Sequence, residues 1–142
     1  MAIENFIYFD GNCREAVEYY AEVFGLDKPQ FMICKDVPGI PDFVGTDEDR
    51  AKGRIMYAGL NIKGSTVMFS DVPNNRKMTI GDNVCLTVSC GTIEETTEIF
   101  DKLKEGGQVR IALQEVFFTK CLGSLTDKFG LNWFVVFFPE SR

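Results

Sequence analysis

The chain has 142 residues, a formal net charge of -6, 13 phenylalanines and no histidine. The negative charge argues against nucleic acid and anionic membranes as partners, because both bind basic surfaces. The absence of histidine excludes Ser-His-Asp triads, Cys-His nucleophile pairs and His-Glu-x-x-His metal helices. Any chemistry must therefore use carboxylates, Lys, Tyr, Cys or backbone groups.

Two further features of the composition concern the compartment. No segment approaches the roughly 20 apolar residues that cross a bilayer, and the first residues lack a basic start and a signal cleavage site. The 5 cysteines are scattered and form no Cys-x-x-Cys pair, so neither a zinc ribbon nor a redox motif is expected. We predict a cytoplasmic protein with reduced, mostly buried thiols.

The first half of the chain predicts a strand, a helix and three further strands. Residues 3–9 are apolar and aromatic, as in a strand. A helix is expected between Asn12 and Gly25, with Asn12 and Glu15 placed as in a capping box. The three strands that follow are predicted at 29–37, 54–62 and 65–72, with Lys63-Gly64 as the turn of a hairpin.

The second half repeats the same order of elements. A strand is predicted at 83–90, and Thr92 with Glu95 forms a second capping box before a helix that ends at Gly106. Strands follow at 108–117, 120–127 and 131–138, and the polar turn between Asp127 and Gly130 is the last hairpin.

This repetition indicates an internal duplication within one domain, residues 1–142. The first module spans residues 1–75 and the second spans residues 80–142. Each module has half of a core, so the two are expected to pack together. The predicted class is α+β, with two tandem βαβββ modules.

Three stretches carry a resemblance to a known family: YFDGNCREAVEYYAEVFG (8–25), IMYAGLNIKGSTVMFSD (55–71) and GSLTDKFGLNW (123–133). They resemble the PhnB-like branch of the vicinal oxygen chelate superfamily, which includes glyoxalases, bleomycin-resistance proteins and dioxygenases. Members of this branch are also called demethylubiquinone methyltransferase-like. The resemblance implies a cupped mixed sheet of the glyoxalase/dihydroxybiphenyl-dioxygenase type, a central cavity and a homodimer. Methyl transfer is not expected, because no glycine-rich nucleotide loop follows any predicted strand.

The resemblance also implies where a metal would bind. In metal-dependent members, His and Glu side chains on the first and last strands of each half hold a divalent ion that acts as a Lewis acid. The matching positions here fall near Asn5, near Asn83, at Phe69 or Ser70 beside Asp71, and at Phe134. A histidine of the third strand corresponds to Tyr57. Because these are weak donors or none, we predict no metal and no cofactor.

Six residues are nonetheless candidates to line a ligand cavity: Asn5, Cys34, Tyr57, Asp71, Asn83 and Trp133. Such a cavity needs an apolar wall with a few polar groups. Tyr57 and Trp133 can equally be core aromatics, and Asp71 can simply end its strand. The acidic segment 38–53 is a solvated loop or a lid over the site.

Three functions follow from these expectations, and no catalytic residue is assigned. The first is metal-free binding of a small organic ligand in the cavity. The second is a metal-independent enzyme that uses Asp, Tyr or Cys for acid-base or nucleophilic chemistry. The third is an interaction or regulatory role, with the cavity filled by phenylalanine side chains.

Overall fold

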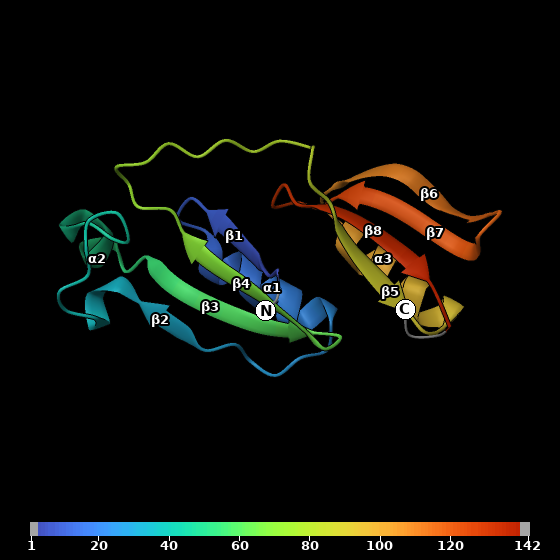
Figure 1. Ribbon diagram of the computed structural model, residues 1–142, viewed down its shortest axis with the longest axis horizontal. Helices are drawn as coiled ribbons and strands as arrows, with labels where there is room; N and C mark the ends of the chain where they lie inside the picture. Colours follow the sequence, from blue (N-terminus) through green and yellow to red (C-terminus); the bar gives the residue numbers. More distant parts are fainter. Residues whose placement is uncertain (1–2, 140–142) are drawn as a thin grey trace. The chain divides into compact units, whose positions relative to one another are not determined.

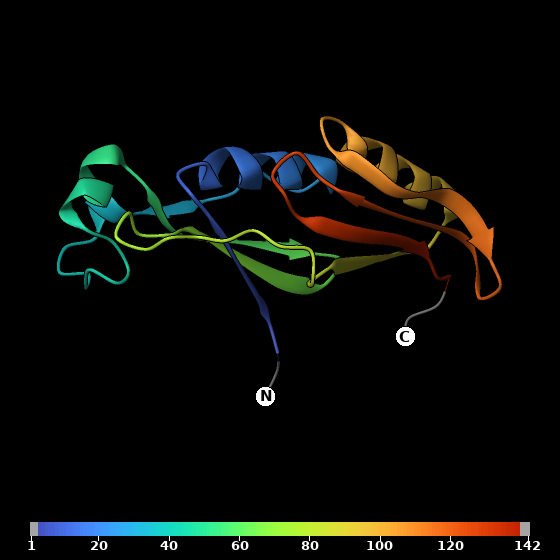
Figure 2. The same cartoon turned by 90° about the horizontal axis from the view of Figure 1, so that it is seen from above.

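The computed structural model describes residues 3–139, which form two compact units that meet in sequence between Thr79 and Ile80. Each unit contains a four-stranded mixed sheet with one long helix on one face of it (Figure 1, Figure 2). The predicted α+β class, built from two βαβββ modules, is confirmed. No helix in the part of the chain that the structure describes is long and apolar enough to cross a membrane.

The first module holds β1 (Asn5–Phe9), α1 (Cys13–Val23), β2 (Phe31–Ile33), β3 (Ile55–Ile62) and β4 (Ser65–Asp71). The sheet order is β1-β4-β3-β2, with β1 parallel to β4 and the other neighbours antiparallel. Lys63 and Gly64 both have positive φ, at 52° and 87°, as a two-residue hairpin turn requires. The predicted hairpin is therefore confirmed.

The core of the first module lies between α1 and one face of this sheet. The ring of Tyr20 on α1 stacks on Phe69, with centroids 5.8 Å apart, and lies 6.5 Å from Phe9. Neighbouring residues of a strand point to opposite faces. Phe9 and Phe69 therefore face α1, whereas Tyr8 and Met68, one position away, face the other side.

The N-terminus of α1 is held by a carboxylate from the other end of the module. Asp71 Oδ1 accepts hydrogen bonds from the backbone N–H groups of Gly11 (2.9 Å) and Cys13 (3.0 Å). Asp71 Oδ2 accepts a third from Ile55 N–H (2.9 Å). The predicted capping box at Asn12 is wrong: its side chain makes no capping hydrogen bond, and its φ and ψ of -111° and 20° lie outside the extended region of an N-cap.

The second module holds β5 (Leu86–Cys90), α3 (Ile93–Lys104), β6 (Gln108–Val116), β7 (Thr119–Thr126) and β8 (Asn132–Phe137). The sheet order β5-β8-β7-β6 repeats that of the first module, with β5 parallel to β8. The duplication extends to single bonds. Val72 N–H donates to Phe9 C=O at 2.7 Å, and Phe138 N–H donates to Cys90 C=O at 2.9 Å.

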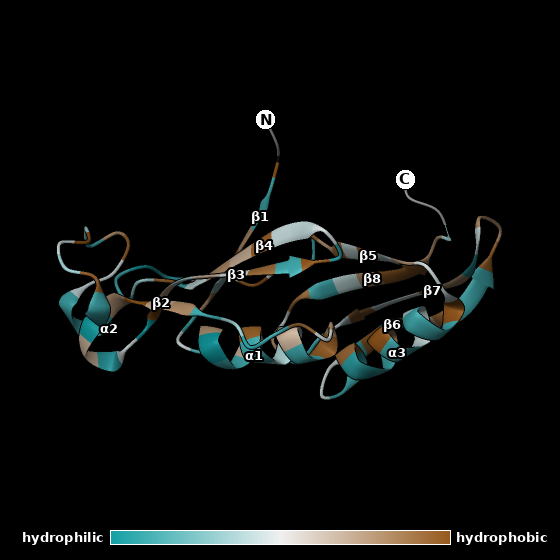
Figure 3. Ribbon diagram, turned by 90° about the horizontal axis from the view of Figure 1, so that it is seen from below, coloured by the Kyte–Doolittle hydropathy of each residue, from teal (hydrophilic) through white to brown (hydrophobic). Residues whose placement is uncertain are grey.

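The helix of the second module is capped locally. Thr92 Oγ1 accepts from Glu95 N–H at 3.0 Å, as predicted, while Glu95 Oε1 accepts from Gly91 N–H at 3.2 Å. The helix packs closely on β7, because a Cβ on Gly123 would lie 2.5 Å from the ring of Phe100. Figure 3 shows hydrophobic and hydrophilic residues mixed around α1 and α3, as expected for helices with one face on a sheet.

Two predicted strand boundaries and one predicted loop differ from the structure. The strand predicted at 29–37 ends at Ile33, because its register shifts there and the chain continues as a 3-10 helix, η1 (Cys34–Asp36). The strand predicted at 83–90 begins only at Leu86. The predicted loop 38–53 contains a short helix, α2 (Asp47–Lys52).

Candidate functional site

Three aromatic rings lie together on the face of the first sheet that α1 does not cover. Phe6 and Tyr8 come from β1, with centroids 5.1 Å apart, and Tyr57 comes from β3, 6.4 Å from Phe6. Phe6 is 43% exposed and Tyr8 is 38% exposed. We call these three residues the aromatic face. It combines apolar surface with polar hydroxyl groups, as small-molecule sites do.

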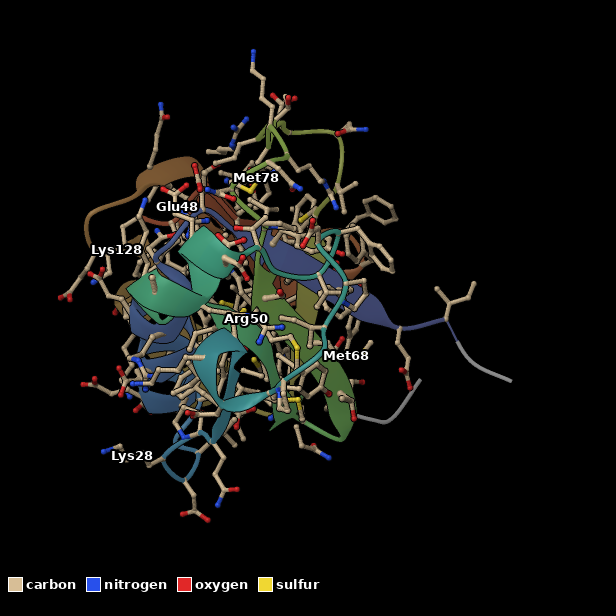
Figure 4. The ribbon with its side chains drawn as sticks, turned by 90° about the vertical axis from the view of Figure 1, so that its left-hand side faces the viewer. Lys28, Glu48, Arg50, Met68, Met78 and Lys128 are labelled. Atoms are coloured by element: carbon tan, nitrogen blue, oxygen red, sulfur yellow. The ribbon has the colours of Figure 1, made fainter. Side chains whose placement is uncertain are left out.

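Two methionines and an arginine border the aromatic face. Met32 on β2 pairs with Tyr57 and is 48% exposed. Met68 pairs with Phe6 and lies on the side of the sheet away from α1 (Figure 4). The guanidinium of Arg76 lies 4.6 Å from the centroid of the Tyr8 ring, a cation–π contact. Flexible methionines beside rigid rings adapt to a bound shape.

Tyr57 also reaches a groove at the edge of β3. This β3 groove, of about 560 Å³, is lined by residues 26–30 and by Tyr57, Gly59, Leu60, Asn61 and Thr66. The Tyr57 hydroxyl lies above Gly59, where a Cβ would be 2.9 Å from it. Tyr57 is half-buried and is therefore not one of the core aromatics.

The carboxylate of Asp71 has little capacity left for a ligand. It is only 3% exposed, and its three backbone hydrogen bonds engage both oxygens. Its position explains why the sequence places an acid at the end of β4. The N-terminus of α1 needs an acceptor, and a carboxylate supplies a strong one.

Cys34 lies in η1 rather than on a strand, and it is 2% exposed, beside Ile40 and Gly45. Burial raises the pKa of its thiol, and the nearby carboxylates of Asp49 and Asp71 raise it further. Burial, with the charge of Asp71, also raises the pKa of Cys13. All five cysteines have free thiols. These two thiols are poor nucleophiles, because the thiolate is the reactive form.

The remaining candidates are dispersed. Asn5 pairs with the buried Val67 and so lies on the α1 side of its sheet, opposite Tyr57. Asn83 is exposed in the segment that precedes β5. Trp133 is 3% exposed, pairs with Leu125, and is a core residue of the second module. Within the first module, the structure brings only Tyr57 to the uncovered face of the sheet, beside two residues that sequence reasoning missed.

Polar contacts of the buried Asp49 join the segment 38–53 to the rest of the module. Asp49 forms a capping box with Thr46 and accepts from the N–H of Asn74 at 3.1 Å. Arg54 joins Asp49 (3.5 Å), Asp10 (3.0 Å) and the carbonyl of Val72 (2.8 Å). The Thr-Asp-Glu-Asp run at 46–49 was the sequence signal for this helix. A lid role for the segment stays a prediction.

The donor set does not fit the divalent metal of the superfamily. Among residues 3–139, no three His, Cys, Asp or Glu side chains gather as metal ligands would. Asp71, the one acid near the predicted ligand positions, is already engaged by three N–H donors. The other positions carry Asn or Phe, which bind divalent ions weakly or not at all. We therefore derive no step through a metal.

These modules define a protein with the glyoxalase/bleomycin-resistance/dioxygenase fold. A glyoxylase/bleomycin resistance protein/dioxygenase domain from Frankia sp. EAN1pec shares it, with a TM-score of 0.61 at 12% identity over 96% of each chain. The family model described as 3-demethylubiquinone-9 3-methyltransferase matches residues 1–136, so the chain belongs to that family.

Two relatives match over nearly the whole chain. Protein YjdN of Escherichia coli K12 is 28% identical over 141 residues, which cover 95% of this chain and 94% of YjdN. A putative 3-demethylubiquinone-9 3-methyltransferase, PhnB protein, from Bacillus cereus is 27% identical, with a TM-score of 0.74 over 97% of this chain and 100% of that one. The predicted membership of the PhnB-like branch is confirmed.

The family description names a methyltransferase, so the fit of a methyl-donor cofactor needs a test. Nucleotide cofactors commonly bind at the first turn between a strand and a helix, through backbone N–H groups. Here the N–H groups of Gly11 and Cys13 at that turn already donate to Asp71. The turn does not fit such a cofactor, and we derive no methyl transfer step.

Proposed function

We propose that the protein binds a small aromatic organic ligand, without a metal ion, against the aromatic face of its first module. The observation that carries this proposal is the exposure of Phe6 and Tyr8 beside Tyr57. Adjacent exposed rings are costly in water, and they provide stacking surface for a planar ligand. A homodimer in the cytoplasm is part of the proposal, in keeping with the resemblance.

The test is a titration with N-phenyl-1-naphthylamine, a neutral aromatic probe that fluoresces in apolar sites, in buffer that contains a chelator. We expect binding to the wild-type chain and about fivefold weaker binding to Phe6→Ala, because one ring contact contributes about 1 kcal/mol. Phe117→Ala is the matched control, since Phe117 is 100% exposed in the second module. Equal affinity for all three proteins, or no binding, would overturn the proposal.

A metal-independent enzyme is the second candidate, and one group favours it. The hydroxyl of Tyr57 makes no hydrogen bond within residues 3–139 and borders the β3 groove. By contrast, Asp71 is saturated by backbone N–H groups and Cys34 has a raised pKa. Under this alternative, Tyr57→Phe abolishes a turnover that Asp71→Asn reduces only through stability.

A further inference from the structure

We infer that the β3 groove is the second half of the ligand site and holds an acidic substituent, a carboxylate or sulfonate, of the aromatic ligand. This inference rests on the proposed function, because it extends the aromatic face into a polar pocket. The ligand class becomes an aromatic acid rather than a neutral aromatic compound.

Tyr57 joins the two halves of the site. Its ring lies 6.4 Å from that of Phe6 and belongs to the aromatic face. Its hydroxyl lies over Gly59 in the groove, and a Cβ on residue 59 would be only 2.9 Å from that oxygen. The Tyr57 side chain therefore spans the distance between the aromatic face and the groove. A planar ligand that stacks on the aromatic face can place its polar end in the groove.

Three side chains of the groove offer hydrogen-bond donors. Asn61 Oδ1 already accepts from Gly64 N–H at 2.9 Å, which leaves the two amide hydrogens of Asn61 as donors. The hydroxyls of Tyr57 and Thr66 can donate as well. Ionised acceptors form the stronger hydrogen bonds with such groups, so the arrangement favours an anion.

The charge of the groove comes from two neighbouring residues of opposite sign. Lys28 is exposed, projects outward from the segment between α1 and β2 (Figure 4), and forms no ion pair within residues 3–139. Asp27, also exposed, is the one carboxylate in the lining. Lys28 therefore attracts an anionic substituent and Asp27 opposes it, and the two can be tested with opposite expected signs.

The experiment compares two probes on the full chain. 8-Anilino-1-naphthalenesulfonate and N-phenyl-1-naphthylamine share their rings and differ by one sulfonate. We expect Lys28→Met to weaken binding of the sulfonate probe about fivefold, which is the size of one charge-assisted contact. Binding of the neutral probe should stay unchanged. Asp27→Asn is expected to strengthen the sulfonate probe about twofold.

Lys35→Met is the matched control, because it removes an exposed positive charge elsewhere in the same module. An equal effect of Lys35→Met would show that the preference for the sulfonate probe comes from overall charge, and it would overturn the groove inference. If Phe6→Ala weakens both probes while the changes at Lys28 and Asp27 leave their affinity ratio unchanged, the aromatic face stands and the groove inference falls. If Phe6→Ala affects neither probe, the proposed function fails, and the groove inference fails with it.

Discussion

The indole nitrogen of Trp133 donates a hydrogen bond of 2.8 Å to Asp127 Oδ2, and both side chains are almost fully buried. Asp127 Oδ1 accepts from the N–H groups of Phe129 and Leu131, at 2.8 and 3.1 Å. The polar turn before the last strand is thus joined to that strand by one carboxylate. Three N–H donors surround the carboxylate of Asp127.

Replacing Trp133 by Phe should lower the free energy of unfolding by about 2 kcal/mol, because Asp127 Oδ2 stays buried but loses the hydrogen bond from the indole N–H. Urea unfolding followed by circular dichroism measures this loss. Tryptophan fluorescence cannot serve as the signal, because the substitution removes the single tryptophan of the chain. Asp127→Asn and the double variant complete a thermodynamic cycle. Strictly additive effects would contradict a direct contact between the two side chains.

Asp71→Asn should cost about 2 to 4 kcal/mol, because an amide cannot accept from three N–H groups as a carboxylate does. Asp10→Asn is the control: Asp10 is largely exposed and pairs with Arg54 at the surface. Its change should cost less than about 1 kcal/mol. The same denaturation experiment compares both, and equal losses would show that the bonds from Gly11, Cys13 and Ile55 contribute little.

The stability of the first module should depend on the ionisation of Asp49. Burial alone raises the pKa of this carboxyl, but the hydrogen bonds from Thr46 and Asn74 and the charge of Arg54 hold it below its ordinary value. A lowered folded-state pKa contributes stability above the unfolded-state value, about 3.9, which is lost as pH falls through the folded-state value. Asp49→Asn should therefore be less stable at neutral pH and lose less on acidification below about pH 4.

Thermal unfolding between pH 2 and pH 7 measures this dependence on Asp49. Asp47→Asn is the control, since Asp47 lies exposed in the first turn of the same helix. A wild-type curve parallel to that of Asp49→Asn over the acid range would contradict the assignment.

Gly59→Ala should weaken the sulfonate probe about fivefold, because the new methyl group displaces the Tyr57 hydroxyl from the groove. The Cβ would lie 2.9 Å from that oxygen, and only the flexible end of the tyrosine must move. Gly91→Ala is the control, since nothing lies within 4 Å of a Cβ there. Unchanged affinity of the Gly59 variant would show that the hydroxyl takes no part in binding.

Divalent metals should leave both stability and probe binding unchanged. The expectation follows from the donor set around Asp71, which offers no second strong ligand. Native mass spectrometry of protein purified without chelator, together with melting curves in manganese, zinc or chelator, checks it. A stoichiometric metal ion, or a melting temperature that rises with one metal, would contradict it.

The regular elements of both modules could be predicted because each has a clear local signal. Thr92 and Glu95 mark the start of α3, and Lys63-Gly64 fixes the β3–β4 hairpin. The order of elements then repeated, which made the duplication and the fold class recognisable. The predicted strand ends were wrong where the chain leaves the sheet, as at Cys34, because a register shift has no signature in the sequence.

The candidate site was less predictable, for two physical reasons. Asn5 became a candidate because the family resemblance places a metal-ligand position near it. Alternation along 3–9 separates two sets of residues but does not say which set a helix covers, so Phe6 and Tyr8 were missed. The partners of Asp71 lie about 60 positions earlier in the chain, at Gly11 and Cys13, beyond any local pattern. Tyr57 was recognised because the family resemblance marks its position.

The two helices also differ in when they can form during folding. The cap of α3 joins Thr92 to Glu95, three positions apart, and can exist before any sheet does. The first turn of α1 depends on Asp71 at the end of β4. This contact can form only after the chain between Cys13 and Asp71 has closed into a loop. We therefore predict that the start of α3 forms independently of its sheet, whereas the first turn of α1 is completed only once β4 is in place.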